Sequence, residues 1–265
     1  MAHGDFTWID LSTFEVEATK KFYRSCFQWE FDEDDSGYVN CSRSNSACAG
    51  LYEMPEFFQK IKMPSFWMTY ISVTGIDAVV AKAKELGGKI EIEETNALGK
   101  VALIRDPAGA GFTCYEGSAE SALSEDGQDG RWCGSELFVS DLSKVKDFYE
   151  GVFGWSLEAE EGQSERYLIR NEGKHIGAVQ VASNEEKGDK EFWGVFFGVR
   201  NAEETLASIR EAGGEVSYEH QNSSGTHYLV YDPQGAAFFV TEESGDAVGQ
   251  SPHKSGLKWE AGSLV

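Results

Sequence analysis

The 265-residue sequence has few basic residues and no long apolar run. Lys and Arg together number 23 against 45 Asp and Glu, which gives a formal net charge of −22. A polyanion of this kind repels phosphate backbones and anionic lipid, so we expect neither nucleic acid nor a membrane as a partner. No apolar run approaches the ~20 residues that span a bilayer. Residues 1–5 also lack the basic and apolar segments of a signal peptide.

Cysteine is also scarce. The five cysteines are an odd number and include no C-x-x-C spacing, which argues against a disulfide framework and a structural zinc site. We therefore expect a reduced, cytoplasmic compartment. The phosphate-binding motifs G-x-x-x-x-G-K-S/T and G-x-G-x-x-G are missing, so no phosphate cradle is predicted. Core-forming residues, in contrast, are abundant: 41% of the chain is hydrophobic and 13% aromatic, which excludes general disorder.

The most informative feature of the sequence is an internal repeat. Landmark residues recur 126 positions apart: Phe22-Tyr23 as Phe148-Tyr149, Trp29 as Trp155, Phe66-Trp67 as Phe192-Trp193, and Asp106-Pro107-x-Gly109 as Asp232-Pro233-x-Gly235. Rare residue types do not agree this often by chance, so the protein contains two copies of one domain. We place the first domain at residues 1–117, a Gly-, Ser- and acid-rich linker at 118–130, the second domain at 131–243 and a tail at 244–265.

Each copy contains the same order of elements twice. Alternation predicts a strand at residues 6–11, followed by a helix around Phe22 and three short strands. A second strand at 65–73 restarts the order, and its helix ends at Gly87, since glycine adopts the left-handed cap conformation at little cost. The turn at 106–109 has Asp, Pro and Gly where a type I turn favours them. The fold class is therefore α+β, with at most eight helices and about sixteen short strands.

Two strand–helix–three-strand units per domain, an F-Y pair at the end of the first helix, an F-x-W motif after it and a D-P-x-G hairpin form a recognisable set. The chain resembles the vicinal oxygen chelate (VOC) superfamily, which includes glyoxalase I, extradiol dioxygenases, and bleomycin and fosfomycin resistance proteins. The motifs cover residues 6–117 and 132–243. The resemblance implies two tandem VOC domains, in each of which two βαβββ units form a half-open mixed barrel around a cleft.

Metal-dependent members of this superfamily place His, Gln or Glu on the strands that face the cleft. The resemblance assigns three of these ligand positions in each domain to other residue types: Trp8, Met68 and Thr113 in the first, and Gly134, Gly194 and Phe239 in the second. A hard divalent ion needs several oxygen or nitrogen donors that converge on it. We therefore expect no metal site and no cofactor, with the fourth-strand position left unaligned.

Strand alternation predicts a large, aromatic and lightly polar cleft face, which suits an organic ligand. In the first domain this face comprises Trp8, Asp10, Met68, Tyr70, Thr113 and Tyr115, and in the second Gly134, Glu136, Gly194, Phe196, Phe239 and Thr241. The alternative is that these side chains simply fill the barrel as core. Two glycines stand where the first domain has Trp8 and Met68, which predicts more room in the second cleft.

The equivalent carboxylates Asp10 and Glu136 are the candidate catalytic residues. A carboxylate in an apolar cleft can have a raised pKa and act as a base. The alternative is a structural acid that accepts hydrogen bonds from backbone or a tyrosine. The histidines do not repeat between the copies, and we expect His175 and His227 on loops or at the surface.

Three hypotheses for function remain open. The first is metal-independent binding of a small aromatic organic molecule, as in the resistance-type members of the superfamily. The second is a glyoxalase-, dioxygenase- or hydroxylase-type enzyme, with unaligned metal ligands or a metal-free acid–base mechanism. The third is a non-catalytic module that binds a protein partner. Two copies in one chain can complete their barrels internally, so we expect a monomer or a homodimer.

Overall fold

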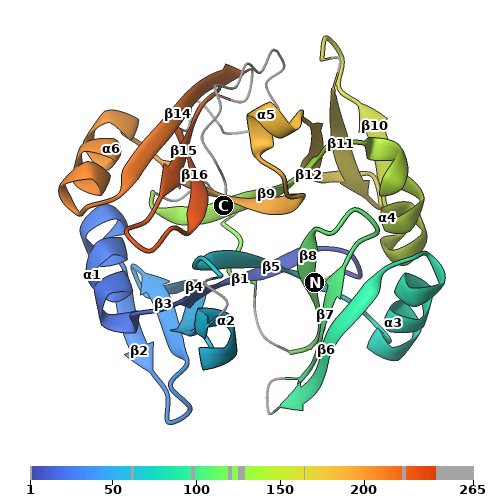
Figure 1. Cartoon of the computed structure of the whole chain (residues 1–265), viewed down its shortest axis with the longest axis horizontal. Helices are drawn as coiled ribbons and strands as arrows, with labels where there is room; N and C mark the ends of the chain where they lie inside the picture. The colour runs from blue at the N-terminus through green and yellow to red at the C-terminus, as the bar shows by residue number, and fades with distance from the viewer. Residues whose placement is uncertain are drawn as a thin grey trace.

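The computed structural model describes residues 2–60, 63–96, 99–118, 121–124, 129–163, 165–222 and 225–242. Two eight-stranded mixed sheets form the protein, and each is built by one copy of the repeat (Figure 1). The sixteen strands and six α-helices of this part of the chain agree with the α+β prediction.

The first sheet has the strand order β2-β3-β4-β1-β5-β8-β7-β6. Its strands are β1 (Phe6–Thr13), β2 (Glu30–Glu33), β3 (Val39–Arg43), β4 (Ser46–Glu53), β5 (Phe66–Ser72), β6 (Lys89–Asn96), β7 (Gly99–Arg105) and β8 (Gly111–Gly117). The helices of this domain are α1 (Val16–Phe27), α2 (Glu56–Lys60) and α3 (Ile76–Glu85).

The second sheet repeats this order as β10-β11-β12-β9-β13-β16-β15-β14. Its strands are β9 (Arg131–Val139), β10 (Ser156–Ala159), β11 (Arg166–Asn171), β12 (Lys174–Val181), β13 (Phe192–Val199), β14 (Glu215–Asn222), β15 (Gly225–Tyr231) and β16 (Ala237–Glu242). The 3₁₀-helix η1 (Leu142–Lys144) precedes α4 (Lys146–Phe153), and α5 (Asn184–Lys187) and α6 (Ala202–Glu211) follow.

Each domain consists of two βαβββ units, as the resemblance implies. Within a unit the first strand pairs with the last in parallel, as β1 does with β4 and β5 with β8. The two units of a domain meet through antiparallel pairs, β1 with β5 and β9 with β13. One continuous sheet per domain results, and strand alternation gives it one face toward the core and one toward the cleft.

The local sequence signals act as predicted. Asn201 accepts a hydrogen bond from the Glu204 backbone N–H at 3.1 Å and so caps α6. Gly87 and Gly213 follow α3 and α6 with φ of 88° and 90°, the left-handed conformation that glycine adopts without strain. In the turn at 106–109, the backbone N–H of Gly109 donates to the carbonyl of Asp106 at 3.0 Å.

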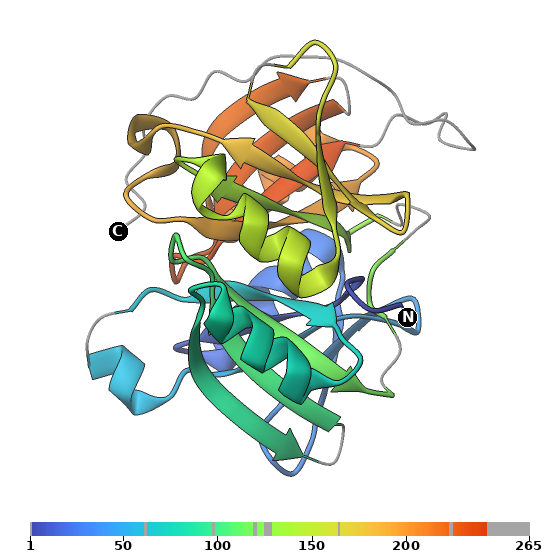
Figure 2. The same ribbon diagram turned by 90° about the vertical axis from the view of Figure 1, so that its right-hand side faces the viewer.

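The two domains share one hydrophobic core. Helix α1 lies beside α6 and α3 beside α4, so that helices of different domains pair at two edges of the molecule (Figures 1 and 2). Aromatic rings continue the contact: the ring centroids of Phe27 in α1 and Phe197 in β13 are 5.1 Å apart. A single buried cluster contains residues of both sheets, so neither domain has a separate core on this side.

The repeated landmark residues form this interface. The Tyr149 hydroxyl donates to Asp106 Oδ2 of the opposite domain at 2.9 Å, and Trp193 Nε1 donates to the Tyr149 hydroxyl at 3.0 Å. The symmetric contact joins Tyr23 and Asp232 at 3.3 Å. The F-Y and D-P-x-G motifs are therefore partners across the duplication, and they position the two sheets back to back.

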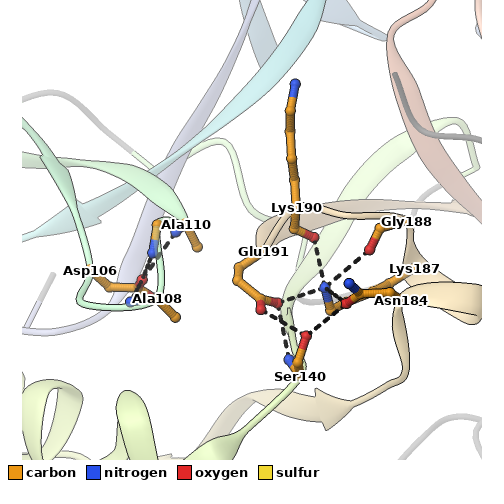
Figure 3. A network of polar contacts seen from close by, with 10 residues as sticks. Asp106, Ala108, Ala110, Ser140, Asn184, Lys187, Gly188, Lys190 and Glu191 are labelled. Carbon is orange, nitrogen blue, oxygen red and sulfur yellow. Dashed lines mark hydrogen bonds and ion pairs between the residues drawn. The ribbon is translucent and has the colours of Figure 1, made fainter.

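A buried lysine holds the segment between β12 and β13 (Figure 3). The Lys187 ammonium lies 2.9 Å from Glu191 Oε2 and donates to the carbonyls of Gly188 at 3.2 Å and Lys190 at 3.1 Å. Glu191 in turn accepts from the Ser140 backbone N–H at 3.0 Å. These contacts compensate the burial of the charge and tie the start of β13 to the end of β9.

None of the described helices has both the length and the apolar character that crossing a bilayer requires.

Candidate binding clefts

The second-domain cleft contains a cavity of about 790 Å³. Four of the six residues expected on its face line it: Gly134, Glu136, Phe196 and Thr241. Ser121 and Leu123, which follow the first sheet, contribute to its wall together with Phe6 at the start of β1. The cavity therefore lies on the second sheet but is closed in part by the first domain and the segment that joins the two.

The two glycines of this cleft have different surroundings. A Cβ at Gly134 would meet no atom within 4 Å, so the position is open space. A Cβ at Gly194 would lie 2.7 Å from Phe239 Cε2 and 3.0 Å from Phe138 Cε2. The expectation of extra room at Gly194 is therefore wrong, because aromatic rings occupy it.

These rings form a continuous stack. Phe196 lies on Phe239 with centroids 4.5 Å apart, Phe239 on Phe138 at 5.3 Å, and Phe138 on Phe192 at 5.0 Å. The stack buries Phe239 beneath Phe196, and Phe196 is its member at the cavity wall. Gly194 and Phe239, the other two expected cleft residues, do not line the cavity but pack beneath the residues that do.

A buried ion cluster borders the same cavity. Arg166 on β11 forms a bidentate pair with Glu136 at 2.5 Å and donates from Nε to Glu160 at 2.8 Å. Burial alone raises the pKa of Glu136, but the charge and hydrogen bonds of Arg166 hold that pKa below its ordinary value. Glu136 is therefore ionised and engaged near neutral pH, and is better suited to carrying a charge than to accepting a proton.

His175 and His227 both line this cavity. His175 on β12 is exposed, as expected, whereas the expectation of a surface or loop histidine is wrong for His227, which is half-buried on β15. His227 on β15 stands opposite Thr241, and its ring meets Phe196 edge-on at 5.6 Å. Burial lowers the pKa of His227 to about 4 and lowers that of His175 as well. Both imidazoles are thus neutral at pH 7, where each can donate from one ring nitrogen and accept at the other.

Alternation could have located one of these histidines. Residues directly opposite each other in an antiparallel pair share a face, so placing Thr241 on the cleft side also places His227 there once β15 and β16 are paired. The irregular register between β11 and β12 begins at the pair of Arg170 with His175. That bulge shifts the alternation, so no sequence pattern predicts the side on which His175 lies.

The first-domain cleft has a buried acid at its centre. Asp10 is 2% exposed and accepts a hydrogen bond from the Tyr70 hydroxyl at 2.6 Å through Oδ2. Burial raises the pKa of Asp10 to about 7, and the bond from Tyr70 opposes this only in part. Asp10 is thus the opposite of Glu136: its charge is not compensated, and it holds a proton close to neutral pH.

Aromatic side chains surround Asp10. Trp8 Nε1 donates to the Tyr38 hydroxyl at 2.9 Å, and the rings of Tyr38 and Tyr52 stack with centroids 6.4 Å apart. Trp8, Met68 and Tyr70 are half-buried, whereas Thr113 and Tyr115 on the neighbouring strand β8 are buried. The six residues expected on this face therefore divide into an accessible rim and a buried floor.

The strand registers show how the two clefts diverged. Gly50 pairs with both Asp10 and Asn40, and Ala178 pairs with both Glu136 and Leu168. Leu168 on β11 and Asn40 on β3 are therefore equivalent. Arg166 lies two residues before Leu168 and Tyr38 two residues before Asn40, so Tyr38 is the equivalent of Arg166. The spacing here is 128 residues instead of 126. One domain thus places a phenol beside its cleft carboxyl, where the other places a guanidinium.

The residues present do not fit the divalent ion of the metal-dependent relatives. Trp8, Met68, Gly134, Gly194 and Phe239 offer no oxygen or nitrogen ligand from their side chains suited to such an ion, and Thr113 offers only a hydroxyl. Across the described ranges, no three His, Cys, Asp or Glu side chains are grouped so that they could hold a metal. Glu136, whose charge acts on both His175 and His227, is already paired with Arg166.

Comparison with known proteins shows the family to which this architecture belongs. The Glyoxalase/Bleomycin resistance protein/Dioxygenase superfamily matches twice, at residues 6–113 and 132–239. "Putative glyoxylase CFP32" of Mycobacterium tuberculosis is 30% identical over 249 residues, covering 89% of this chain and 94% of the relative. "Anthracycline biosynthesis protein DnrV" of Streptomyces peucetius is 27% identical over 262 residues, covering 91% of this chain and 94% of the relative.

Solved structures show the same fold at low identity. The Mn(II)-bound glyoxalase from Novosphingobium aromaticivorans superimposes with a TM-score of 0.63 at 13% identity, covering 91% of this chain and 82% of that one. The 2,3-dioxygenase LapB from Pseudomonas sp. KL28 gives 0.64 at 13% identity, covering 99% and 98%. Two tandem family matches and the double βαβββ architecture agree, and the chain belongs to the Glyoxalase/Bleomycin resistance protein/Dioxygenase superfamily.

Proposed function

We propose that this protein binds a small organic molecule with a flat, apolar part in the cavity of the second domain, without a metal ion. The observation that carries the proposal is the open space above Gly134, in a cavity lined by Phe196 and by Glu136, which Arg166 holds in place. A volume of about 790 Å³ falls within the roughly 300–1,000 Å³ of small-molecule pockets. Apolar walls with a few fixed polar groups are typical of such sites.

The charges at the cavity favour a neutral or cationic molecule. The acids Asp5, Glu136 and Glu242 line the cavity together with Lys174, and Arg166 and Glu160 form ion pairs beside it, so acids outnumber cations by two. An anion would be repelled by this excess of negative charge. The neutral imidazoles of His175 and His227 supply hydrogen bonds that can orient a hydroxyl, carbonyl or amine.

The relatives are consistent with such a ligand. The name of one curated relative connects it with anthracycline biosynthesis, and an anthracycline is a flat polycyclic molecule with polar substituents. Binding without a metal ion is supported by the residue types at the family's ligand positions. We therefore propose recognition of a molecule of this general shape.

A fluorescence titration tests the proposal. N-phenyl-1-naphthylamine is neutral, carries a flat naphthalene ring and is brightly emissive only in apolar surroundings. We expect saturable binding at one site per chain that EDTA leaves unchanged and that Gly134→Trp abolishes, because the indole fills the space above residue 134. Phe57→Trp is the matched control: it adds an indole to the exposed helix α2, where Phe57 is 65% exposed, and should leave binding intact. Equal affinity of Gly134→Trp and the unmodified protein would refute the proposal.

A further inference from the structure

We propose that the first-domain cleft is a second, chemically distinct site, which binds a conjugated aromatic ketone or aldehyde through two hydrogen bonds to its carbonyl oxygen, donated by the Asp10 carboxyl group and the Tyr38 hydroxyl. This site is separate from the second-domain cavity, and neither proposal depends on the other. It rests on a buried acid with one oxygen lacking a partner, a neighbouring phenol with a hydrogen to donate, and an aromatic rim.

The two oxygens of Asp10 differ. Oδ2 accepts from Tyr70 at 2.6 Å, whereas the buried Oδ1 has no hydrogen-bond partner in the described part of the chain. Leaving a buried carboxyl oxygen unpaired is costly, so such an atom marks a place where a further group is expected. Because Oδ2 already accepts a hydrogen bond, a proton held by this carboxyl group belongs on Oδ1, which then donates.

Asp10 holds that proton near neutral pH. Burial raises its pKa to about 7. The titratable groups that face it from neighbouring elements are the phenols of Tyr38, Tyr52 and Tyr70, and the pKa of each is raised well above its ordinary value. All three stay neutral across the range in which Asp10 titrates. In the described residues no cation stands beside Asp10 in the way that Arg166 stands beside Glu136.

Tyr38 supplies the second donor. Its hydroxyl accepts from Trp8, so its own hydrogen remains to be donated. The hydroxyl lies over Gly50, where a Cβ would come within 1.8 Å of it, and Gly50 is the residue paired with Asp10 in the neighbouring strand. Glycine at this position therefore lets the phenol approach the acid. The Asp10 charge also contributes to the raised pKa of Tyr38, which agrees with this proximity.

Two convergent donors of this kind fit a carbonyl oxygen. A phenol and a protonated carboxyl group stabilise negative charge that accumulates on such an oxygen. The half-buried faces of Trp8, Tyr52 and Tyr70 can stack on a conjugated ring. Met68 is the cross-strand partner of Asp10, and its flexible unbranched side chain can move aside to admit the carbonyl group. The site would polarise a carbonyl, as a metal ion does in metal-dependent enzymes, and binding itself breaks no bond.

The experiment uses 2-acetylnaphthalene labelled with ¹³C at the carbonyl, in the full-length chain carrying Gly134→Trp so that the second cavity is closed. We expect saturable binding with a lowered carbonyl stretching frequency, and an affinity that falls as the pH rises through about 7 because ionised Asp10 repels the carbonyl oxygen. Asp10→Asn keeps a donor without a titration and should make the affinity independent of pH. Tyr38→Phe should weaken binding by about tenfold, the effect of one lost hydrogen bond.

Two controls make the result decisive. 2-Ethylnaphthalene has the same ring without the carbonyl oxygen and should bind more weakly, with no dependence on pH. Asp77→Asn removes an exposed carboxylate on α3, 82% exposed, and should leave the affinity and its pH profile unchanged. The proposal is overturned if 2-acetylnaphthalene does not bind, if the ethyl analogue binds equally well, or if Asp10→Asn keeps the pH dependence. If the N-phenyl-1-naphthylamine titration fails, the proposal for the second-domain cavity is refuted, but each of these results still tests the first-domain cleft.

Discussion

Asp10 should make the folded protein less stable as the pH rises from about 4 to about 7. In the unfolded chain its pKa is near the ordinary value of 3.8, and in the folded protein burial raises that pKa to about 7. Between these values the native state binds a proton that the unfolded state does not, so the free energy of unfolding falls by about 1.4 kcal/mol for each pH unit. The whole interval corresponds to about 4 kcal/mol. Above pH 7 both states are ionised, and the loss is complete.

Asp10→Asn isolates this contribution. The amide has nearly the same shape, can accept from Tyr70 and carries no charge in either state. We expect the variant to match the original protein near pH 4 and to exceed its free energy of unfolding by up to about 4 kcal/mol at pH 8. Urea denaturation at intervals from pH 4 to 9 measures the difference directly. A difference that is the same at pH 4 and pH 8 would refute the reasoning.

Glu136→Gln provides the matched comparison, because its sign is opposite. Arg166 holds the pKa of Glu136 below its ordinary value, so this carboxylate stabilises the fold above the pKa of the unfolded chain. The stabilisation is lost as the pH falls through the lowered pKa. Glu136→Gln should therefore be less stable than the original protein at pH 8, with a deficit that shrinks toward low pH. Two variants at equivalent positions would then respond to pH in opposite directions.

Five further substitutions test the interface and the second cleft by urea denaturation. Tyr149→Phe removes a hydrogen bond to a buried carboxyl group across the domains and should cost about 1–3 kcal/mol. Tyr23→Phe should cost less, because its bond is longer at 3.3 Å against 2.9 Å, and equal losses would contradict the proposed asymmetry. Arg166→Met leaves two buried carboxylates unpaired and should cost about 3–5 kcal/mol at pH 8, with a smaller loss at pH 4. Gly194→Ala places a Cβ 2.7 Å from Phe239 and should cost about 1–3 kcal/mol by overpacking. Gly134→Ala enters open space and should change stability little, so similar losses for both glycines would contradict the cavity's position.

The fold could be read from the sequence because its landmarks are contacts that the duplication preserves. Tyr149 and Asp106 bind across the domain interface, as do Tyr23 and Asp232, so each copy retains both halves of the contact. The helix caps at Gly87 and Gly213 depend on backbone geometry that a single residue type reveals. Where a local preference, such as that of a turn or a helix cap, and the tertiary packing require the same residue, the sequence predicts the structure well.

The candidate sites were only partly predictable. Strand alternation located Asp10 and Glu136 but could not show which of them has a cationic partner. That partner, Arg166, lies outside the 126-residue register, and its equivalence to Tyr38 follows only from the strand pairing. The space above Gly194 depends on where the Phe239 ring turns, which is a matter of tertiary packing. The position of His175 depends on a strand irregularity that leaves no mark in the sequence.

The most direct test of the central claim is a crystal structure of the full chain with N-phenyl-1-naphthylamine, grown in the presence of EDTA. We expect density for the molecule in the second-domain cavity, above Gly134 and against the Phe196 ring, with Glu136 still paired to Arg166. Density for the molecule only elsewhere, or binding that requires an added divalent ion, would contradict metal-independent binding in this cavity.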